Sequence, residues 1–327
     1  MTAITGQAAS SGHITLLFSV QDDDVNLINQ GSRGIGFCID PVEPTCQITV
    51  TGKHGSGKIS EQIQNENLVL QQTVINTLSQ LVPSVLEYDW LIQQSCRLPQ
   101  QQGFGLSAAG ALATALALQR ALGEEEQLAY AQSFHVAHVV ERKLSGGLGD
   151  VSALWAGGVD LRREPGCPQV SEILGGSGVV EGWHTTLNML VAWRDRTTRH
   201  TSAYIDDEEW KTRIRNSGEQ QLTILKQGVW DKSRWGDILT TSTGFANDSE
   251  LISDAGRTEL LQIAKSVISI AEVEASAHLC MLGESLVILP TSLESGLKSE
   301  KMLLMIEQFN SMGLKSIQVS LTENSLR

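Results

Sequence analysis

Residues 102–110 read QGFGLSAAG, and this stretch decides the fold of the chain. Its small residues and single hydroxyl are followed at once by an Ala-rich apolar segment, residues 111–122. Gly103 and Gly105 permit backbone angles that other residues rarely adopt. The pattern therefore predicts a glycine loop that leads into the N-terminus of a helix over residues 106–122.

The start of such a helix suits a phosphate group. Its first N–H groups have no partner inside the helix, and the helix dipole places partial positive charge there. Ser107 stands where its hydroxyl either caps the helix or reaches a metal ion bound to the phosphate. A glycine-rich turn with a serine cap also opens many ordinary helices, so both interpretations stay open.

The overall composition predicts a soluble globular protein with one large domain or two. The chain has 327 residues, of which 41% are hydrophobic, and it contains no apolar run long enough to cross a bilayer. A net charge of -13 argues against nucleic acid and anionic membranes as partners. Five scattered cysteines without a C-x-x-C pair, and a first segment without signal-peptide features, favour a cytoplasmic location.

A second glycine-rich segment, residues 52–59 with the sequence GKHGSGKI, nearly matches a P-loop. It fits G-x-x-x-x-G-K after a predicted strand, but Ile59 stands where a P-loop has the Ser or Thr that binds magnesium. The next residues along the chain are polar, whereas a P-loop leads into an apolar helix. We favour the alternative interpretation, a turn that carries basic residues.

Two carboxylates come after the first glycine loop along the chain. Glu141 lies on a predicted helix over residues 124–144, and Asp150 closes a third glycine loop, residues 146–150. Two histidines precede Glu141 at spacings of three, but the outer members of this set lie about 120° apart around the helix and do not meet at one ion. Together with Ser107, the two carboxylates could hold Mg-ATP and a substrate hydroxyl. Taken alone, a glutamate such as Glu141 is more often a solvated charge, and an aspartate such as Asp150 is more often a turn or N-cap residue.

In this order the motifs resemble those of the GHMP kinase superfamily. Residues 98–109, LPQQQGFGLSAA, look like its P-x-x-x-G-L-G-S-S-A phosphate motif, with Leu106 in place of the first Ser. Residues 147–150, GLGD, look like the segment that carries the catalytic aspartate of the family. Within the superfamily, GHIT at residues 12–15 and GSRGIG at residues 31–36 are similar to the archaeal pantoate kinase family.

The resemblance implies an α+β fold with the two domains of a GHMP kinase. These are an N-terminal mixed α/β nucleotide-binding domain over residues 1–178 and a C-terminal ferredoxin-like α+β domain over residues 179–327. The implied reaction is the ATP-dependent phosphorylation of pantoate to 4-phosphopantoate in archaeal coenzyme A biosynthesis. Two alternatives stay open, namely a GHMP-type kinase of another small alcohol such as homoserine or a mevalonate-like acid, and a non-catalytic nucleotide-binding protein.

The resemblance also implies site residues. Those expected to hold the ATP phosphates are Gly103, Phe104, Gly105, Leu106, Ser107, Ala108 and Ala109. Ser107 and Glu141 are expected to hold Mg²⁺, and Asp150 to act at the substrate hydroxyl as the catalytic residue. The residues expected at the pantoate are Arg33, as the partner of its carboxylate, with Ser32 and His13. A homodimer is left open.

Overall fold

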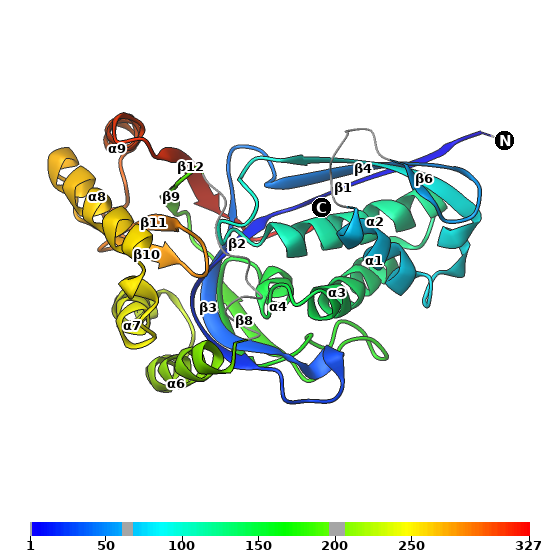
Figure 1. Ribbon diagram of the computed structural model, residues 1–327, viewed down its shortest axis with the longest axis horizontal. Helices are drawn as coiled ribbons and strands as arrows, with labels where there is room; N and C mark the ends of the chain where they lie inside the picture. Colours follow the sequence, from blue (N-terminus) through cyan, green and yellow to red (C-terminus); the bar gives the residue numbers. More distant parts are fainter. Residues whose placement is uncertain (1, 61–67, 196–206) are drawn as a thin grey trace.

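The computed structural model describes residues 2–60, 68–195 and 207–327, and it confirms the α+β architecture expected from the sequence (Figure 1). One sheet of the described chain has four strands in the order β1-β4-β6-β5. Its strands are β1 (Ile4–Ser10), β4 (Cys46–His54), β5 (Ile59–Ser60) and β6 (Tyr88–Cys96). Among these described strands, only β5 runs parallel to its neighbour, β6.

A larger sheet of eight described strands has the order β10-β11-β9-β12-β3-β7-β8, with β2 paired to β3. Its strands are β2 (Gly12–Gln21), β3 (Gly31–Asp40), β7 (Val159–Glu164), β8 (Val179–Trp183), β9 (Asn188–Trp193), β10 (Ala275–Cys280), β11 (Ser285–Pro290) and β12 (Lys315–Leu321).

Strand β12 connects the two halves of the large sheet, because it pairs with β9 on one side and with β3 on the other. The sheet is therefore continuous across the expected boundary between residues 178 and 179. Moreover, β8 begins at Val179, directly after this boundary, and it pairs with β7. The division into residues 1–178 and 179–327 stays a prediction.

The helices cover these sheets in separate groups (Figure 1). Those on the side of the four-stranded sheet are α1 (Val69–Leu78), α2 (Leu106–Leu122) and α3 (Glu126–Lys143). Helix α4 (Asp150–Ala156) packs against α3 and against strands β2, β3, β7 and β8 of the large sheet. Those that pack on the second half of the chain and on β2 are α6 (Glu208–Leu225), α7 (Trp235–Asp248), α8 (Ala255–Ala271) and α9 (Ser299–Ser311). The expected helices over 106–122 and 124–144 are thus confirmed, the latter as α3.

Helix α2 is almost entirely buried because its alanines allow close packing on every side. A Cβ atom placed on Gly6 of β1 would lie 2.1 Å from the carbonyl oxygen of Ala117. Only a glycine on the strand and small residues on the helix permit this approach. The Ala-rich pattern that identified the helix therefore also sets its depth beneath the sheet.

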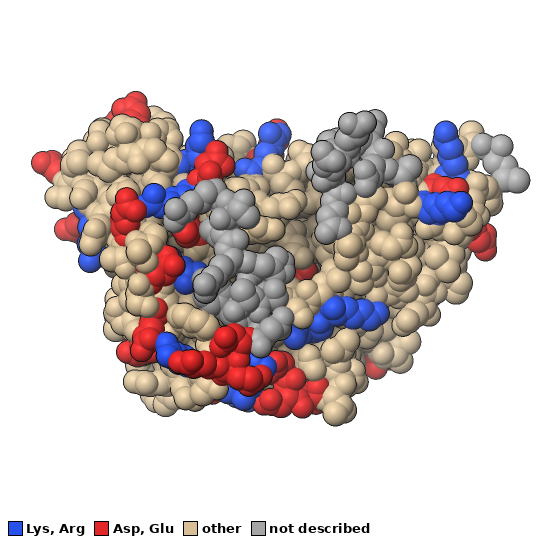
Figure 2. Space-filling view, viewed as in Figure 1, with Lys and Arg blue, Asp and Glu red and all other residues tan. Residues whose placement is uncertain are grey.

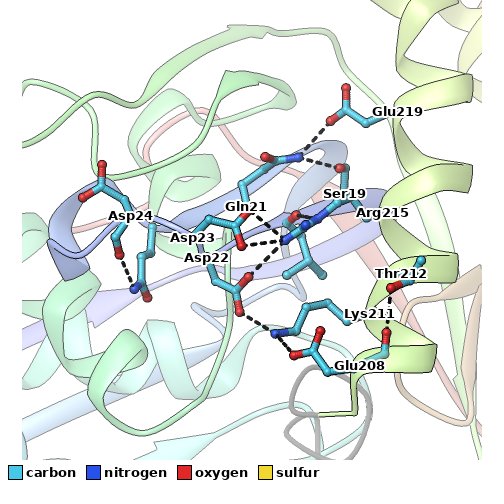
Figure 3. Close-up of polar contacts among 12 residues, drawn as sticks. Ser19, Gln21, Asp22, Asp23, Asp24, Glu208, Lys211, Thr212, Arg215 and Glu219 are labelled. Atoms are coloured by element: carbon cyan, nitrogen blue, oxygen red, sulfur yellow. Dashed lines mark hydrogen bonds and ion pairs between the residues drawn. The ribbon is translucent and has the colours of Figure 1, made fainter.

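Helix α6 is held to the end of β2 by charged side chains (Figure 3). Arg215 donates to the carbonyl of Val20 at 2.8 Å and to Asp22 at 3.2 Å, and Lys211 lies 3.0 Å from Asp22. Acidic side chains gather at the lower left of the molecular surface, near α6 (Figure 2). Part of the net negative charge is therefore used in ion pairs that fix this helix.

No described helix is both long enough and apolar enough to cross a membrane. All five cysteines are free thiols. The cytoplasmic location stays a prediction.

Candidate active site

The glycine loop ends where α2 begins, and two of its glycines have left-handed backbone angles. Gly103 has φ 77° and Gly105, the N-cap of α2, has φ 64°. A Cβ on Gly103 would lie 2.9 Å from the carbonyl oxygen of Met281, so a side chain there would collide with the β10–β11 turn. The predicted loop-to-helix transition is confirmed, and its first-turn N–H groups are placed to bind an anion.

Ser107 does not cap the helix, because it lies in the first turn and Gly105 is the cap. Its hydroxyl instead donates to Oε1 of Glu141 on α3. The backbone N–H of Gly147 donates to Oε2 of the same carboxylate at 2.6 Å. Glu141 is almost fully buried, and this burial raises its pKa to about 7. A hydroxyl and a carboxylate from distant segments therefore meet at the start of α2.

Asp150 is the first residue of α4, and its carboxylate lies against β2. Its Oδ1 lies 2.6 Å from Nδ1 of His13 and 3.5 Å from the hydroxyl of Thr15. Burial disfavours the charged carboxylate, but the hydrogen bond and charge of His13 outweigh it and lower the pKa of Asp150. Asp150 is therefore ionised at neutral pH and ready to accept a proton or a hydrogen bond.

These groups surround one cavity of about 800 Å³. Its lining includes Gly103 of the glycine loop and the polar residues Thr15, Ser32, Ser107, Glu141 and Asp150. The volume is within the range of small-molecule sites. The lining also includes Gln71 and Gln94.

Most residues expected from the sequence reach this cavity. Five of the seven residues expected at the phosphates line it, namely Gly103, Phe104, Gly105, Leu106 and Ser107. Ala108 and Ala109 are fully buried within α2 and do not belong to its described lining. Ser32 lines the cavity, and His13 lies behind Asp150. The roles assigned to these residues stay predictions.

Arg33 points elsewhere. Its guanidinium lies 2.8 Å from Glu164 and 3.2 Å from Glu219, and Arg33 does not belong to the described lining of the cavity. Two carboxylates already satisfy its charge. The local sequence could not show this, because Glu219 lies 186 residues beyond Arg33 in the chain.

A second arginine, Arg162 of β7, lies directly behind the cavity wall and was not expected from the sequence. Its side chain is 1% exposed, and its Nη1 lies 3.3 Å from Oδ1 of Asp160. Within the described residues, none of its three guanidinium nitrogens has an acceptor in hydrogen-bond geometry. A Cβ on Gly149 would lie 2.4 Å from Ser32 Oγ and 2.8 Å from Arg162 Nε. One feature of the sequence could have pointed to it. Asp160 and Arg162 stand two residues apart in a short strand, which places both side chains on one face of the sheet.

The P-loop-like segment forms a turn beside β6. Oδ1 of Asp89 accepts hydrogen bonds from the backbone of Ser56 at 2.8 Å and of Lys58 at 3.0 Å. Strand β5 begins immediately after Lys58, whereas a P-loop leads into a helix. The segment does not line the described cavity, and the favoured interpretation as a turn is confirmed.

Comparison with known proteins shows what the part of the chain around the cavity is similar to. The model of the GHMP kinases N terminal domain matches residues 67–158, which contain Ser107, Glu141 and Asp150. This part of the chain is similar to the N-terminal domain of GHMP kinases.

Three relatives carry a more particular name, pantoate kinase, and two of them show the range of the similarity. The pantoate kinase of Thermococcus kodakarensis is 41% identical over 90 residues, which are 28% of this chain and 29% of the relative. The pantoate kinase of Methanocaldococcus jannaschii is 26% identical over 277 residues, which are 84% of this chain and 89% of the relative. The chain thus aligns with less than a third of the first relative and with most of the second.

Solved structures share the fold over the whole chain. A protein described as a phosphotransferase related to the CoA biosynthesis pathway has a TM-score of 0.75 and 22% identity, with 99% of this chain and 98% of that chain covered. A complex of MDDEF with MVAPP, AMPPCP and magnesium has a TM-score of 0.66 and 12% identity, with coverages of 100% and 99%. At these identities the similarity shows the fold.

Proposed function

We propose that this protein is an ATP-dependent kinase that phosphorylates pantoate to 4-phosphopantoate in archaeal coenzyme A biosynthesis. One observation carries the proposal. The start of α2, the Ser107–Glu141 pair and the ionised Asp150 surround a single cavity. The relatives named pantoate kinase support the choice of substrate. A cytoplasmic location and an archaeal source belong to the same proposal.

The residues at the start of α2 fit a magnesium nucleotide. Ser107 and Glu141 offer oxygen ligands, which Mg²⁺ prefers, and no group of three or more His, Cys, Asp or Glu in the described chain could hold a metal ion. Mg²⁺ is commonly held by one or two protein groups together with substrate phosphates. A similar fold has been solved with AMPPCP and magnesium. When bound, Mg-ATP supplies the phosphoryl group and neutralises charge that develops on it.

Asp150 is the group that we assign to the acceptor alcohol. It lines the cavity and its pKa is lowered, so its carboxylate can accept a hydrogen bond from the hydroxyl. As the alcohol oxygen forms its bond to phosphorus and the bond to the ADP oxygen breaks, the hydroxyl proton passes to Asp150. Such positioned groups contribute about 10²–10⁴ in rate.

We assign the pantoate carboxylate to Arg162 rather than to Arg33. A buried guanidinium without hydrogen-bond acceptors is costly, and a carboxylate beside Ser32 and Gly149 would supply them. The charge of Arg33 is already matched by Glu164 and Glu219. The net charge of the chain, -13, makes a local cation necessary for an anionic substrate.

Steady-state kinetics with Mg-ATP and D-pantoate, homoserine or mevalonate tests the choice of pantoate as the substrate. The same assay on variants tests the assignment of its carboxylate to Arg162. We expect the highest kcat/KM with pantoate. Arg162→Lys should raise the KM for pantoate about ten- to a hundredfold, because an ammonium cannot replace a guanidinium fork. The KM for ATP should stay within twofold.

The matched control is Arg33→Ala, which should change the KM for pantoate by less than twofold. A raised KM for pantoate in Arg33→Ala and an unchanged one in Arg162→Lys would assign the pantoate carboxylate to Arg33 instead. Preference for another alcohol would select the second kinase function, and nucleotide binding without turnover of any alcohol would select a non-catalytic protein.

A further inference from the structure

His13 lies between two carboxylates that come from different segments of the chain. Its Nδ1 is 2.6 Å from Oδ1 of Asp150, and its Nε2 is 2.8 Å from Oδ2 of Asp160. His13 and Asp160 are fully buried, and the three residues lie on β2, α4 and β7. The imidazole therefore connects the group at the reacting hydroxyl to a carboxylate outside the described lining of the cavity.

Both ring nitrogens face carboxylate oxygens, and only the doubly protonated ring can donate to both. Burial disfavours that charged form, but the charges and hydrogen bonds of Asp160 and Asp150 outweigh it and raise the pKa of His13. Arg162 adds a second buried cation next to Asp160. Two carboxylates and two cations thus balance inside the protein.

Two further titratable groups face this cluster from neighbouring elements. Cys38 of β3 is the cross-strand partner of His13, and burial holds the pKa of its thiol well above the ordinary value, so it is neutral. Glu141 of α3 lies near enough to Asp150 for the charge of Asp150 to raise the pKa of Glu141 further. Of these described groups, only His13 contacts both Asp150 and Asp160.

The imidazole has no room to move away from this position. A Cβ on Gly36 would lie 2.3 Å from its Nε2, and a Cβ on Gly105 would lie 3.1 Å from its own Cβ. The backbone N–H of His13 also donates to the carbonyl of Phe104 at 3.0 Å. One residue therefore fixes the distance between the glycine loop and Asp150.

The contacts leave the two oxygens of Asp150 in different surroundings. Oδ1 faces His13 and Thr15, whereas a Cβ on Gly147 of the cavity wall would lie 2.3 Å from Oδ2. Oδ1 is therefore held by His13, and Oδ2 is packed against Gly147.

We propose that His13 is a positioning residue, an imidazolium held between Asp150 and Asp160 that orients the carboxylate of Asp150 toward the acceptor hydroxyl and keeps Asp150 ionised. His13 then does not bind the substrate itself. The inference rests on the proposed function in one respect, the role of Asp150 at the hydroxyl.

The first experiment is independent of turnover. Nitrogen-15 NMR of the histidine side chains in the ligand-free protein reports the protonation of each ring nitrogen as the pH is raised. We expect both nitrogens of His13 to stay protonated at pH 8, and His13→Asn to remove and so identify the signal. A neutral His13 ring at pH 7 would overturn the proposal.

The second experiment measures the pH profile of kcat in two variants. His13→Asn keeps an N–H donor for Asp150 but loses the charge, so kcat should fall about ten- to a hundredfold and the acid limb should move up by about one pH unit. Asp160→Asn does not touch Asp150, but it weakens the hold on the imidazolium, so the alkaline limb should move down. The KM for ATP should stay within twofold in both.

A merely structural role would lower kcat without moving either limb, and that result would contradict the proposal. If His13→Asn does not fold, the pH profile of Asp160→Asn still decides. A doubly protonated His13 in a protein without kinase activity would sink the proposed function and leave the imidazolium standing. An active kinase with a neutral His13 would support the proposed function and overturn the imidazolium.

Discussion

Residues 103–107 and residues 52–58 are both glycine-rich segments, yet the structure uses them differently. The first leads into the buried helix α2 and faces Glu141 and Asp150 across a cavity. The second is a turn between β4 and β5 whose backbone N–H groups bind Asp89. Both segments thus face a carboxylate, but only the first belongs to the described lining of the cavity.

The two segments differ in the residues that come after the last glycine. After Gly105 and Leu106 come a serine and alanines, which form a helix that packs against both α3 and β1. After Gly57 comes Lys58, whose side chain is exposed, and then a strand. A glycine motif therefore predicts a phosphate site only together with the buried helix behind it.

Removing the carboxylate that faces each segment gives the largest expected contrast. Asp150→Asn keeps the shape of the side chain but cannot accept the hydroxyl proton, so kcat should fall about 10²- to 10⁴-fold. Asp89→Asn should leave kcat within twofold, because Asp89 only fixes a turn. Steady-state kinetics with the two folded variants measures kcat for each. Equal losses of kcat would contradict the assignment of the active site to residues 103–107 alone.

Exchanging one functional side chain in each segment should give the next largest contrast. Ser107→Ala removes the hydroxyl that contacts Glu141, so Mg²⁺-dependent activity should fall about a hundredfold, the cost of a lost contact to a charged group. Lys58→Ala should be nearly neutral, since this side chain is exposed and outside the described cavity lining. A Mg²⁺ titration of activity provides the measurement. The reverse result would restore a P-loop at residues 52–59.

The carboxylates of Glu141 and Asp89 should change the free energy of unfolding with opposite dependences on pH. Burial raises the pKa of Glu141 from 4.5 to about 7, so this group favours folding below pH 4.5 and loses that contribution as the pH rises through 7. The shift corresponds to at most about 3 kcal/mol, and Glu141→Gln should stabilise the ligand-free protein by about 2 kcal/mol at pH 8 and little at pH 4.

The carboxylate of Asp89 behaves in the opposite way. Hydrogen bonds from the backbone of Ser56 and Lys58 lower its pKa, so Asp89→Asn should destabilise the protein at pH 8. Urea unfolding at several pH values measures both variants. A Glu141→Gln variant that is less stable at pH 8 than at pH 4, relative to the parent, would refute the raised pKa.

The smallest contrast concerns the glycines themselves. Gly103 and Gly57 have nearly equal backbone angles, φ 77° and 79°, so alanine strains both by about 1–2 kcal/mol. The new Cβ at Gly103 would meet the backbone oxygen of Met281 at 2.9 Å, whereas that at Gly57 would meet the flexible Cδ2 of Leu86 at 3.0 Å. Gly103→Ala should therefore cost about 1 kcal/mol more, and it alone should raise the KM for ATP. Equal losses of stability would show that the contact with Met281 is soft.

Local patterns along the chain were enough for the elements of the site. The loop-to-helix transition, helices α2 and α3 and the turn at residues 52–58 were all predicted, because glycine angles, helix propensity and apolar spacing act over a few residues. The order of the motifs also identified the GHMP kinase fold. The joint roles of Ser107, Glu141 and Asp150 came from that resemblance.

Only the tertiary structure decided which charges meet. Asp150 and Asp160 lie 137 and 147 residues beyond His13, and Glu219 lies 186 beyond Arg33, so no local pattern contains these pairs. No local pattern shows the surroundings of the buried Arg162 either. Residues of β3, α4 and β7 together leave its guanidinium nitrogens without a hydrogen bond. Secondary structure arises from interactions between near neighbours in the chain. The partner of a buried charge depends on which distant strands and helices exclude water around it, and that is known only once they have packed.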